Sequence, residues 1–354
     1  MDTAFAALVA NGLGRERFAL LDVGCSGGID PRWRAFGSHL KALAIDASVT
    51  ECARLRGMER NPDIEYVAAF VAGMQGKKID PTRSQASPLI LRIRDRLSFM
   101  RTRELRDAGL ATAAIEEQLR HNAWEMTQLG DATRPVIVPD LIADRGWTDV
   151  DVLKIDIDGS DFEILQSFDG KLGNLGVLGI QLEVNFVGTD DPTDHSFHNT
   201  DRFMRRQGYE LFRLDVRTYS SRALPARYVW PTPAETLSGR PFQGEAYYAR
   251  DIDAELTAAK RAKLAAILSL WNVPDVAAEL VLAQRPQFAP MFDIDRGLDL
   301  LAAQVQPDRS RKLGYRTYMG SFEADAPWFY RREGNIGLGE RLAAAWQAFT
   351  RPRR

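Results

Sequence analysis

A glycine-rich segment near the N-terminus contains residue types that could bind a nucleoside. It reads Asp-Val-Gly-Cys-Ser-Gly-Gly from Asp22 to Gly28 and follows an apolar run. Gly24 and Gly28 let the backbone turn sharply and approach a ligand with no Cβ in the way. Asp46 follows Asp22 by 24 residues, about the distance at which an acid reaches ribose hydroxyls in nucleotide-binding βαβ units. Residues 22–28, here called the glycine turn, are therefore candidate ligand contacts.

The spacing of the glycines in the glycine turn indicates which class of nucleotide it could bind. The glycines do not follow the G-x-G-x-x-G pattern, so a pyrophosphate cradle for a dinucleotide is not expected. An acid inside the turn motif suits a ligand that carries an ammonium group, such as S-adenosylmethionine. The predicted cofactor contacts are Asp22, Gly24, Ser26, Gly28 and Asp46.

A second group of acids follows an apolar run at residues 150–155. Asp156 comes at the end of that run, where a strand of a parallel sheet would meet the ligand-binding edge. Asp158 and Asp161 lie where the next helix should begin, and an acid there can stabilise the first helical turn. Asp156 is therefore the best candidate for a residue that acts directly on the reacting atoms.

Two further groups of polar residues should open onto the same edge. Glu183 and Asn185 end another apolar run, and with Asp156 they offer oxygen ligands suited to a hard cation such as Mg²⁺. The loop after them carries His195 and His198. Histidine titrates near neutral pH, so His195 is a candidate general base; the alternative is a solvated loop before a helix.

The elements that must position these residues form repeated strand–helix units. Strands are predicted at residues 18–23, 40–45, 64–70, 150–155, 177–184, 209–214 and 246–250, and the first five are apolar with little alternation. Helical patterns lie between several of them, at residues 32–39, 49–56, 161–172 and 200–207. This order predicts an α/β fold with helices on both faces of the sheet.

The two motifs together resemble those of FkbM-type S-adenosylmethionine-dependent methyltransferases. Residues 153–161 are similar to the family signature Leu-Lys-Ile-Asp-x-Glu-Gly-x-Glu, and the glycine turn is similar to Asp-Val-Gly-Ala-Asn-x-Gly. The matching residues of the signature are Lys154, Ile155, Asp156 and Gly159, whereas Asp158 and Asp161 replace Glu, and Ser26 replaces Asn. The resemblance covers roughly residues 15–250.

This resemblance implies a fold and an activity. The fold would be the class I methyltransferase (Rossmann-like) sheet of seven strands, whose final strand runs antiparallel. The activity would be methyl transfer from S-adenosyl-L-methionine to an oxygen, often on sugars or polyketide-derived natural products. A hydroxyl on a sugar, a glycan or a natural product is the favoured acceptor.

Composition excludes several other classes. The net charge of −2 argues against general nucleic-acid binding, and the two cysteines offer neither a disulfide framework nor a zinc site. Asp2 and the lack of a basic region before the short apolar N-terminal run argue against a signal peptide, and no apolar run reaches the length of a membrane span. A cytoplasmic protein is therefore expected.

Two arginine-rich segments could serve an anionic acceptor. Residues 91–106 carry six arginines against two acids, and Arg202, Arg205 and Arg206 form a second group. Arginine pairs well with phosphate, so a phosphorylated or lipid-linked glycan would explain both groups. The alternative is a pair of solvated helix faces.

The predicted domain organisation has one catalytic unit and one extension. Residues 1–252 would form the methyltransferase domain, with a helical insertion at about 74–134. Residues 253–354 carry Ala and Leu at helical spacing and would form a mainly helical extension. Its apolar faces should pack on the sheet layer or on a second copy of the chain, which would give a homo-oligomer.

Two rival functions remain open at this stage. A NAD(P)-dependent oxidoreductase would use a related nucleotide-binding fold, but the absence of G-x-G-x-x-G argues against it. A non-catalytic scaffold could keep the fold and lose the activity. The retained acids Asp22, Asp46 and Asp156 argue against such decay, whereas Ser26 and Asp158 depart from the family pattern.

Overall fold

The structure is a computed structural model that describes residues 2–71, 73, 135–157, 161–188, 190–220, 235–306 and 312–324. The insertion predicted at 74–134 and the arginines of residues 91–106 lie outside the described residues, as do Asp158 and Gly159 of the signature. None of the helices in the described ranges is long and apolar enough to cross a membrane.

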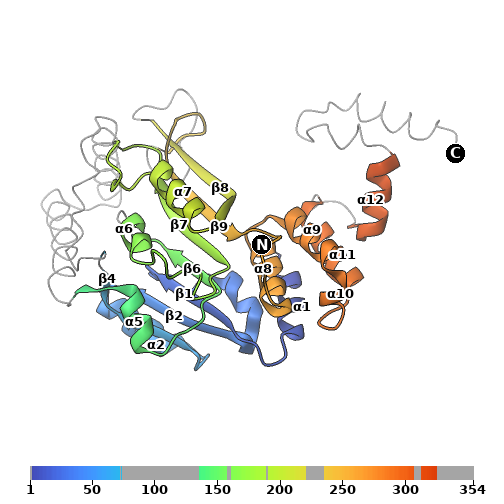
Figure 1. Ribbon diagram of the computed structural model, residues 1–354, viewed down its shortest axis with the longest axis horizontal. Coiled ribbons are helices and arrows are strands. Elements are labelled where there is room, and N and C mark those ends of the chain that lie inside the picture. Colours follow the sequence, from blue (N-terminus) through green and yellow to red (C-terminus); the bar gives the residue numbers. More distant parts are fainter. Residues whose placement is uncertain are drawn as a thin grey trace, which may run out of the picture.

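The core of the molecule is a seven-stranded sheet in the order β3-β2-β1-β6-β7-β9-β8 (Figure 1). The five strands from β3 to β7 are parallel, and β9 lies antiparallel between β7 and β8. This is the class I methyltransferase sheet that the resemblance implied, so the predicted fold class is confirmed. The strands are β1 (Phe18–Val23), β2 (Leu40–Asp46), β3 (Ile64–Ala68), β6 (Val152–Ile155), β7 (Gly179–Asn185), β8 (Tyr209–Tyr219) and β9 (Arg240–Arg250).

Helices cover both faces of this sheet because the central strands are apolar on both sides. All six residues of β1 are buried, and alternate residues of the strand belong to two separate hydrophobic cores. The first face packs against α1 (Ala4–Gly12), the 3₁₀ helix η1 (Pro31–His39) and α8 (Ala258–Leu270). The second face packs against α5 (Val138–Asp144), α6 (Asp161–Gln166) and α7 (Phe197–Arg206).

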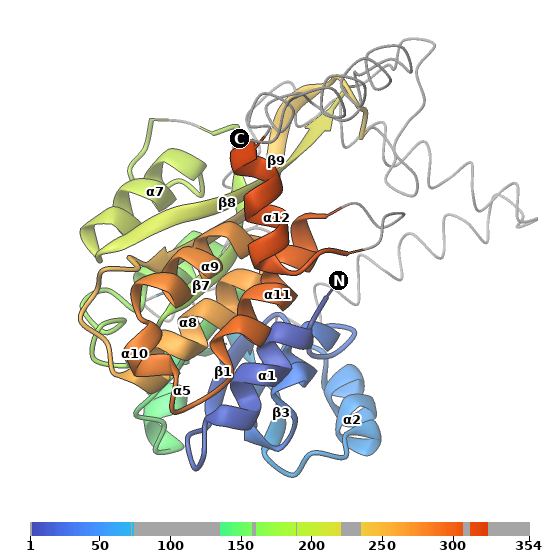
Figure 2. The same cartoon turned by 90° about the vertical axis from the view of Figure 1, so that its right-hand side faces the viewer.

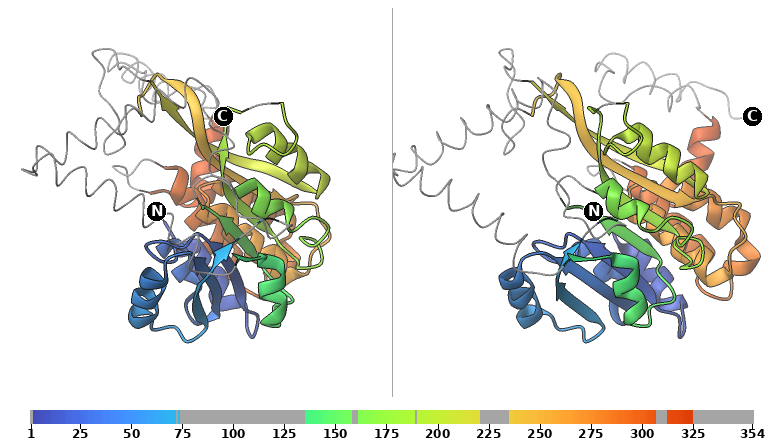
Figure 3. Two further views of the ribbon diagram at one scale, coloured as in Figure 1. Left: turned by 90° about the vertical axis from the view of Figure 1, so that its left-hand side faces the viewer. Right: turned by 60° about the vertical axis from the view of Figure 1, so that its left-hand side comes forward.

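Several elements differ in detail from their predicted form. The helix expected at residues 32–39 is a 3₁₀ helix, interrupted where Gly37 adopts a φ of 54°. The helix expected at 161–172 ends at Gln166. Strands β8 and β9 are longer than predicted and reach past the other strands (Figure 3). A small second sheet pairs β4 (Phe70–Val71) with β5 (Pro135–Val136), which the sequence pattern did not indicate.

The C-terminal part of the described chain is helical. It consists of α8, α9 (Pro274–Ala283), α10 (Arg285–Phe288), α11 (Ile294–Val305) and α12 (Tyr315–Ala324). Figure 2 shows α8 and α11 beside α1, which contacts both, while α9 packs against α8 and α11. The ring of Trp271 lies so close to Gly179 of β7 that a Cβ there would be 2.4 Å from the ring. The division into a domain at 1–252 and an extension at 253–354 stays a prediction, but α8 covers the first face of the sheet.

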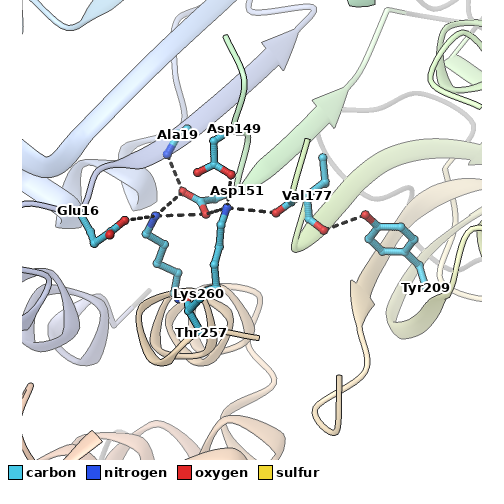
Figure 4. A network of polar contacts seen from close by, with 10 residues as sticks. Glu16, Ala19, Asp149, Asp151, Val177, Tyr209, Thr257 and Lys260 are labelled. Carbon is cyan, nitrogen blue, oxygen red and sulfur yellow. Dashed lines mark hydrogen bonds and ion pairs between the residues drawn. The ribbon is translucent and has the colours of Figure 1, made fainter. Parts of the chain in front are cut away.

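An ionic network fixes α8 to the edge where the parallel strands begin (Figure 4). The Asp151 carboxylate is fully buried and accepts a hydrogen bond from the backbone N–H of Ala19, 2.8 Å away. It also accepts from the ammonium groups of Lys260 at 2.7 Å and Lys263 at 3.0 Å. The Lys263 side chain is itself 1% exposed. This Asp151 network therefore joins α8, β1 and the residue before β6 in a dry environment.

Candidate functional site

The glycine turn lies at the carboxyl edge of the sheet, where the parallel strands end. The backbone N–H groups of Gly24 and Cys25 both donate to the Ile45 carbonyl of β2, at 2.8 and 3.1 Å. Gly24 has a φ of +90°, and a Cβ on it would lie 1.7 Å from the Asp156 carbonyl oxygen. Only glycine fits there, so the turn is closed directly against the residue that follows β6.

The middle of the glycine turn leaves its backbone accessible. Ser26 and Gly27 are exposed, and an ideal Cβ on Gly27 would meet no atom within 4 Å. Gly27 and Gly28 have φ values of +81° and +95°, which side-chain-bearing residues rarely adopt. The turn therefore presents exposed backbone to solvent at Ser26 and Gly27, where the Gly27 N–H donates to Glu51 Oε1 at 3.1 Å.

Asp46 lies at the end of β2, beside the glycine turn. Its Oδ1 accepts a hydrogen bond from the Ser48 N–H at 2.8 Å. Ser48, and not Asp46, is the N-cap of α2 (Val49–Met58), because its hydroxyl accepts from the Glu51 N–H at 3.2 Å. The carboxylate is thus held at the carboxyl edge without being used as a helix cap. Ribose binding by Asp46 stays a prediction.

Lys154 of β6 connects the two acidic motifs. Its ammonium donates to Asp22 Oδ1 at 3.2 Å and to the Gly24 carbonyl at 3.1 Å, and lies 3.4 Å from Asp156 Oδ2. The Asp22 side chain is 2% exposed and that of Asp156 is 41% exposed. Asp22 therefore pairs with an internal ammonium, whereas the motif had suggested the ammonium of a ligand.

The charges of Asp22, Lys154 and Asp156 depend on one another. Burial raises the pKa of Asp22 to about 6, although the neighbouring Lys154 lowers it. Burial acts to lower the pKa of Lys154, but Asp22 and Asp156 together raise it above its ordinary value. Burial also raises the pKa of the Cys25 thiol, and Asp22 adds to that effect. Cys25 thus stays protonated and serves as a buried filler of the turn.

His195 is buried between β7 and α6. Its Nε2 lies 3.0 Å from the Glu183 carbonyl oxygen, and because a carbonyl only accepts, this nitrogen carries the proton. Nδ1 lies 3.5 Å from Asn185 Nδ2 and 3.9 Å from Asp161 Oδ2. The ring is 6% exposed, so its contacts connect the loop after β7 to α6. The role of His195 as a base stays a prediction.

The other candidates near β7 have varied surroundings. His198 is exposed, with its Nε2 3.4 Å from the Ser196 hydroxyl. Asp161 is buried and accepts a hydrogen bond from the Ile157 N–H at 3.0 Å, so it holds the chain just after β6.

The predicted metal ligands end two neighbouring strands. Asp156 follows β6, and Glu183 and Asn185 belong to β7, which pairs with β6. In the part of the chain that the structure describes, no group of three or more His, Cys, Asp or Glu side chains could hold a metal ion. Metal binding by Asp156, Glu183 and Asn185 therefore stays a prediction.

A strip of polar residues on the first face of the sheet was not predicted from the sequence. Lys154 lies opposite Asp22 on one side and Gln181 on the other, and Gln181 lies opposite Tyr247. Gln181 Nε2 and the Tyr247 hydroxyl both donate to Glu245 Oε2, at 2.9 and 2.7 Å. Burial raises the pKa of Tyr247, and its bond to Glu245 raises it further. Polar residues at inward positions of β7 and β9 were the available signal, but only the strand register shows that they meet.

Two of the arginines of α7, Arg202 and Arg205, have partners within the protein. Arg205 donates to Asp201 at 2.9 Å and to Glu210 at 2.7 Å, and Arg202 donates to Asn199 Oδ1 at 3.0 Å. These contacts satisfy Arg205 within the protein. The phosphate site suggested for these arginines gains no support from this geometry.

Comparisons with known proteins address the resemblance. The family profile of the methyltransferase FkbM domain matches residues 109–211. The FkbM resemblance is confirmed for this segment. The matched range includes Lys154, Asp156 and His195 and begins after the glycine turn. A search of curated proteins finds no match.

Solved structures of methyltransferases are similar only at a distance. Magnesium protoporphyrin IX methyltransferase from Synechocystis PCC 6803, solved with bound S-adenosylmethionine, is 10% identical with a TM-score of 0.31, and the match covers 70% of this chain and 77% of that one. Precorrin-6y C5,15-methyltransferase from Geobacter metallireducens GS-15 is 11% identical with a TM-score of 0.32, over 69% and 87% of the two chains. The fold is therefore assigned from the strand order of this chain itself.

Proposed function

We propose that this protein transfers a methyl group from S-adenosyl-L-methionine to a hydroxyl oxygen of a sugar, glycan or natural-product acceptor. The FkbM match and the class I sheet support an S-adenosylmethionine-dependent methyltransferase. The observation that carries the proposal is the closure of the glycine turn against Asp156, through the missing Cβ of Gly24. That contact puts an exposed carboxylate beside the bare backbone that would receive the cofactor.

The residues present fit such a cofactor. The positive-φ residue Gly27 offers backbone without steric hindrance, and Asp46 lies at the end of the neighbouring strand to accept ribose hydroxyls. When bound, S-adenosylmethionine supplies a methyl group that its sulfonium already activates. The protein then has to orient the acceptor, exclude water and remove one proton. Orientation is expected to be the largest of these effects.

Asp156 is the better placed of the two candidate bases. Its side chain is 41% exposed beside the glycine turn, whereas His195 is 6% exposed and donates through Nε2 to a backbone carbonyl. In the proposed reaction the acceptor oxygen would take the methyl group from the sulfonium of the bound cofactor, which would leave as a neutral thioether. Asp156 would accept the hydroxyl proton on its carboxylate and pass it to water.

The polar strip supports a hydroxylated acceptor. Gln181 and Tyr247 hold one oxygen of Glu245, whose side chain is 28% exposed. A carboxylate fixed in this way is well suited to accept hydrogen bonds from hydroxyl groups. A phosphorylated or lipid-linked acceptor, a homo-oligomer and a cytoplasmic location stay predictions.

The test is to incubate the protein with S-adenosylmethionine labelled in the methyl group and a panel of glycosides and hydroxylated natural products, and to detect methylated product by mass. Asp156→Asn keeps the shape and removes the charge, so turnover should fall roughly a hundredfold or more. The fold should survive, since Asp156 is partly exposed. Asp144→Asn, on the exposed end of α5, is the matched control and should leave turnover unchanged.

The same assay separates the alternatives. Full activity of Asp156→Asn would remove Asp156 from the mechanism, and full activity in excess EDTA would remove a divalent ion. Stabilisation by NADPH and not by S-adenosylhomocysteine in a melting experiment would favour the oxidoreductase, because a ligand stabilises the folded form that binds it. Binding of S-adenosylhomocysteine without transfer to any acceptor in the panel would favour the scaffold.

A further inference from the structure

Lys154 lies where the cofactor motif and the catalytic motif meet. It belongs to β6, and the residue paired with it on the neighbouring strand β1 is Asp22, the first residue of the glycine turn. Its ammonium has three N–H groups and three oxygen neighbours, which are Asp22 Oδ1, the Gly24 carbonyl and Asp156 Oδ2 at 3.2, 3.1 and 3.4 Å. The side chain is only 16% exposed, so these neighbours replace most of its hydration.

The burial of Asp22 shows what its carboxylate does. With 2% of its side chain exposed, it offers almost no surface to a ligand that approaches from solvent. The residues of the turn most exposed to a ligand are Ser26 and Gly27, further along the turn. Asp22 therefore acts on a bound ligand through Lys154 and the backbone of Gly24.

We propose that Lys154 is a positioning residue, whose ammonium holds the glycine turn in its ligand-binding shape and orients Asp156 at the same time. It fixes the turn through Asp22 and the Gly24 carbonyl, and it fixes Asp156 through Oδ2. This inference rests on the proposed function in one respect, namely that the cofactor binds at the glycine turn. It changes the role of Asp22 from a contact of the ligand's ammonium to a support of the turn.

The two possible roles of Asp22, as a contact of the ligand's ammonium or as a support of the turn, predict different affinities for a ligand without an amino-acid tail. S-adenosylhomocysteine carries the ammonium group, and 5′-methylthioadenosine has the same nucleoside without it. If Asp22 contacted the ligand's ammonium, Asp22→Asn would weaken only the first ligand. If Asp22 and Lys154 shape the turn, their loss weakens both ligands by the same factor, because both need the turn.

The experiment measures both affinities by calorimetry in wild type, Lys154→Met, Lys154→Arg and Asp22→Asn. Lys154→Met should weaken both ligands roughly ten- to a hundredfold, as expected for lost hydrogen bonds to a charged group. Lys154→Arg keeps the charge and should recover part of that loss. Lys41→Met removes a partly buried lysine from the beginning of β2, where it lies over the Trp147 ring, and should change neither affinity.

The double variant Asp22→Asn with Lys154→Met tests whether the two residues act as a pair. Its affinities should be no lower than those of the weaker single variant, since residues in one network are not additive. If Lys154→Met does not fold, as its melting curve would show, Lys154→Arg and Asp22→Asn still decide the question through the ratio of the two ligands.

The outcomes separate this inference from the proposed function. Wild type that binds neither ligand overturns the proposed function. Wild type that binds both, together with Lys154 variants of unchanged affinity, overturns this inference alone. A loss in Asp22→Asn that is confined to S-adenosylhomocysteine also overturns it, because that result requires direct contact between Asp22 and the ligand.

Discussion

Two lysine–aspartate networks lie at opposite edges of the same sheet, and they differ in their access to water. At the amino edge, Asp151 is fully buried and receives Lys260, Lys263 and a backbone N–H. At the carboxyl edge, Lys154 is shared between buried Asp22 and Asp156, whose side chain is 41% exposed.

This difference is the one expected between charges that stabilise a fold and charges that serve the proposed site. The Asp151 carboxylate and Lys263 are enclosed, whereas Lys260 is 18% exposed and also pairs with the exposed Asp149, so the buried centre of this network serves packing between α8 and the sheet. The Lys154 network ends in an exposed carboxylate and includes an acid whose pKa burial raises to about 6. Perturbed acids in a partly open setting are typical of functional sites.

The largest expected effect concerns the Asp151 network. Asp151→Asn removes the charge that compensates two ammonium groups, and breaking a buried pair typically costs about 3–5 kcal/mol. Urea unfolding should show this loss, while the folded fraction binds S-adenosylhomocysteine with unchanged affinity. Asp149→Asn, whose carboxylate is 47% exposed beside Lys260, is the control and should cost less than about 1 kcal/mol. A weakened cofactor affinity in Asp151→Asn would show that the two edges are not independent.

A smaller effect is expected at the carboxyl edge. Asp46→Ala should lose hydrogen bonds to the ribose and weaken S-adenosylhomocysteine at least about tenfold, measured by calorimetry. Asp46 also accepts from the Ser48 N–H, so the melting temperature of the variant must be recorded alongside. Ser48→Ala removes the helix cap without touching the carboxylate and provides the control. Equal affinities in Asp46→Ala and wild type would exclude the ribose contact.

The smallest expected effect concerns stability and pH. The pKa of Asp22 rises from 3.8 to about 6 on folding, so protonated Asp22 favours the folded state. That contribution is complete below about pH 3.8 and is lost as the pH rises through 6. Asp22→Asn cannot ionise and should therefore be more stable than wild type at pH 7.

The comparison across pH makes the Asp22 prediction specific. Urea unfolding at pH 7 and at pH 4 should show the stability advantage of Asp22→Asn shrinking towards the lower pH. A variant that is less stable than wild type at pH 7 would contradict the prediction. A gain in stability together with weaker cofactor binding would mean that the ionised acid is kept for function at the expense of the fold.

Local features of the fold were predictable, and long-range pairing was not. Strand β1 has the predicted bounds, and Ser48 caps α2 as its sequence indicates, because both depend on adjacent residues. The 3₁₀ form of η1 depends on Gly37, whose φ of 54° no periodicity reveals. The contact between Lys154 and Asp22 joins residues 132 positions apart. It follows from the register of β1 and β6, which a sequence pattern does not contain.

In the candidate site, too, the features set by adjacent residues were predictable and those set by long-range packing were not. The glycine turn and Asp156 were identified from motifs, and the structure brings Gly24 and Asp156 into contact. The burial of His195 arises from packing between β7 and α6, and the link between Gln181 and Glu245 from the pairing of β7 with β9. Polar residue types at the ends of strands could be seen in the sequence, but their exposure could not.

The position of α8 has a consequence for the order of events during synthesis. Ribosomes extend a chain at about 5–20 residues per second, and folding of a domain generally begins at its N-terminal side. Here Lys263 completes the network that holds the beginning of β1, and β9 must enter between β7 and β8 before the sheet is whole. The part of the first face that α8 covers therefore stays exposed until α8 has left the ribosome, although α1 and η1 can already pack on the rest of it. During that interval the unfinished chain is a natural client for chaperones that bind apolar surfaces.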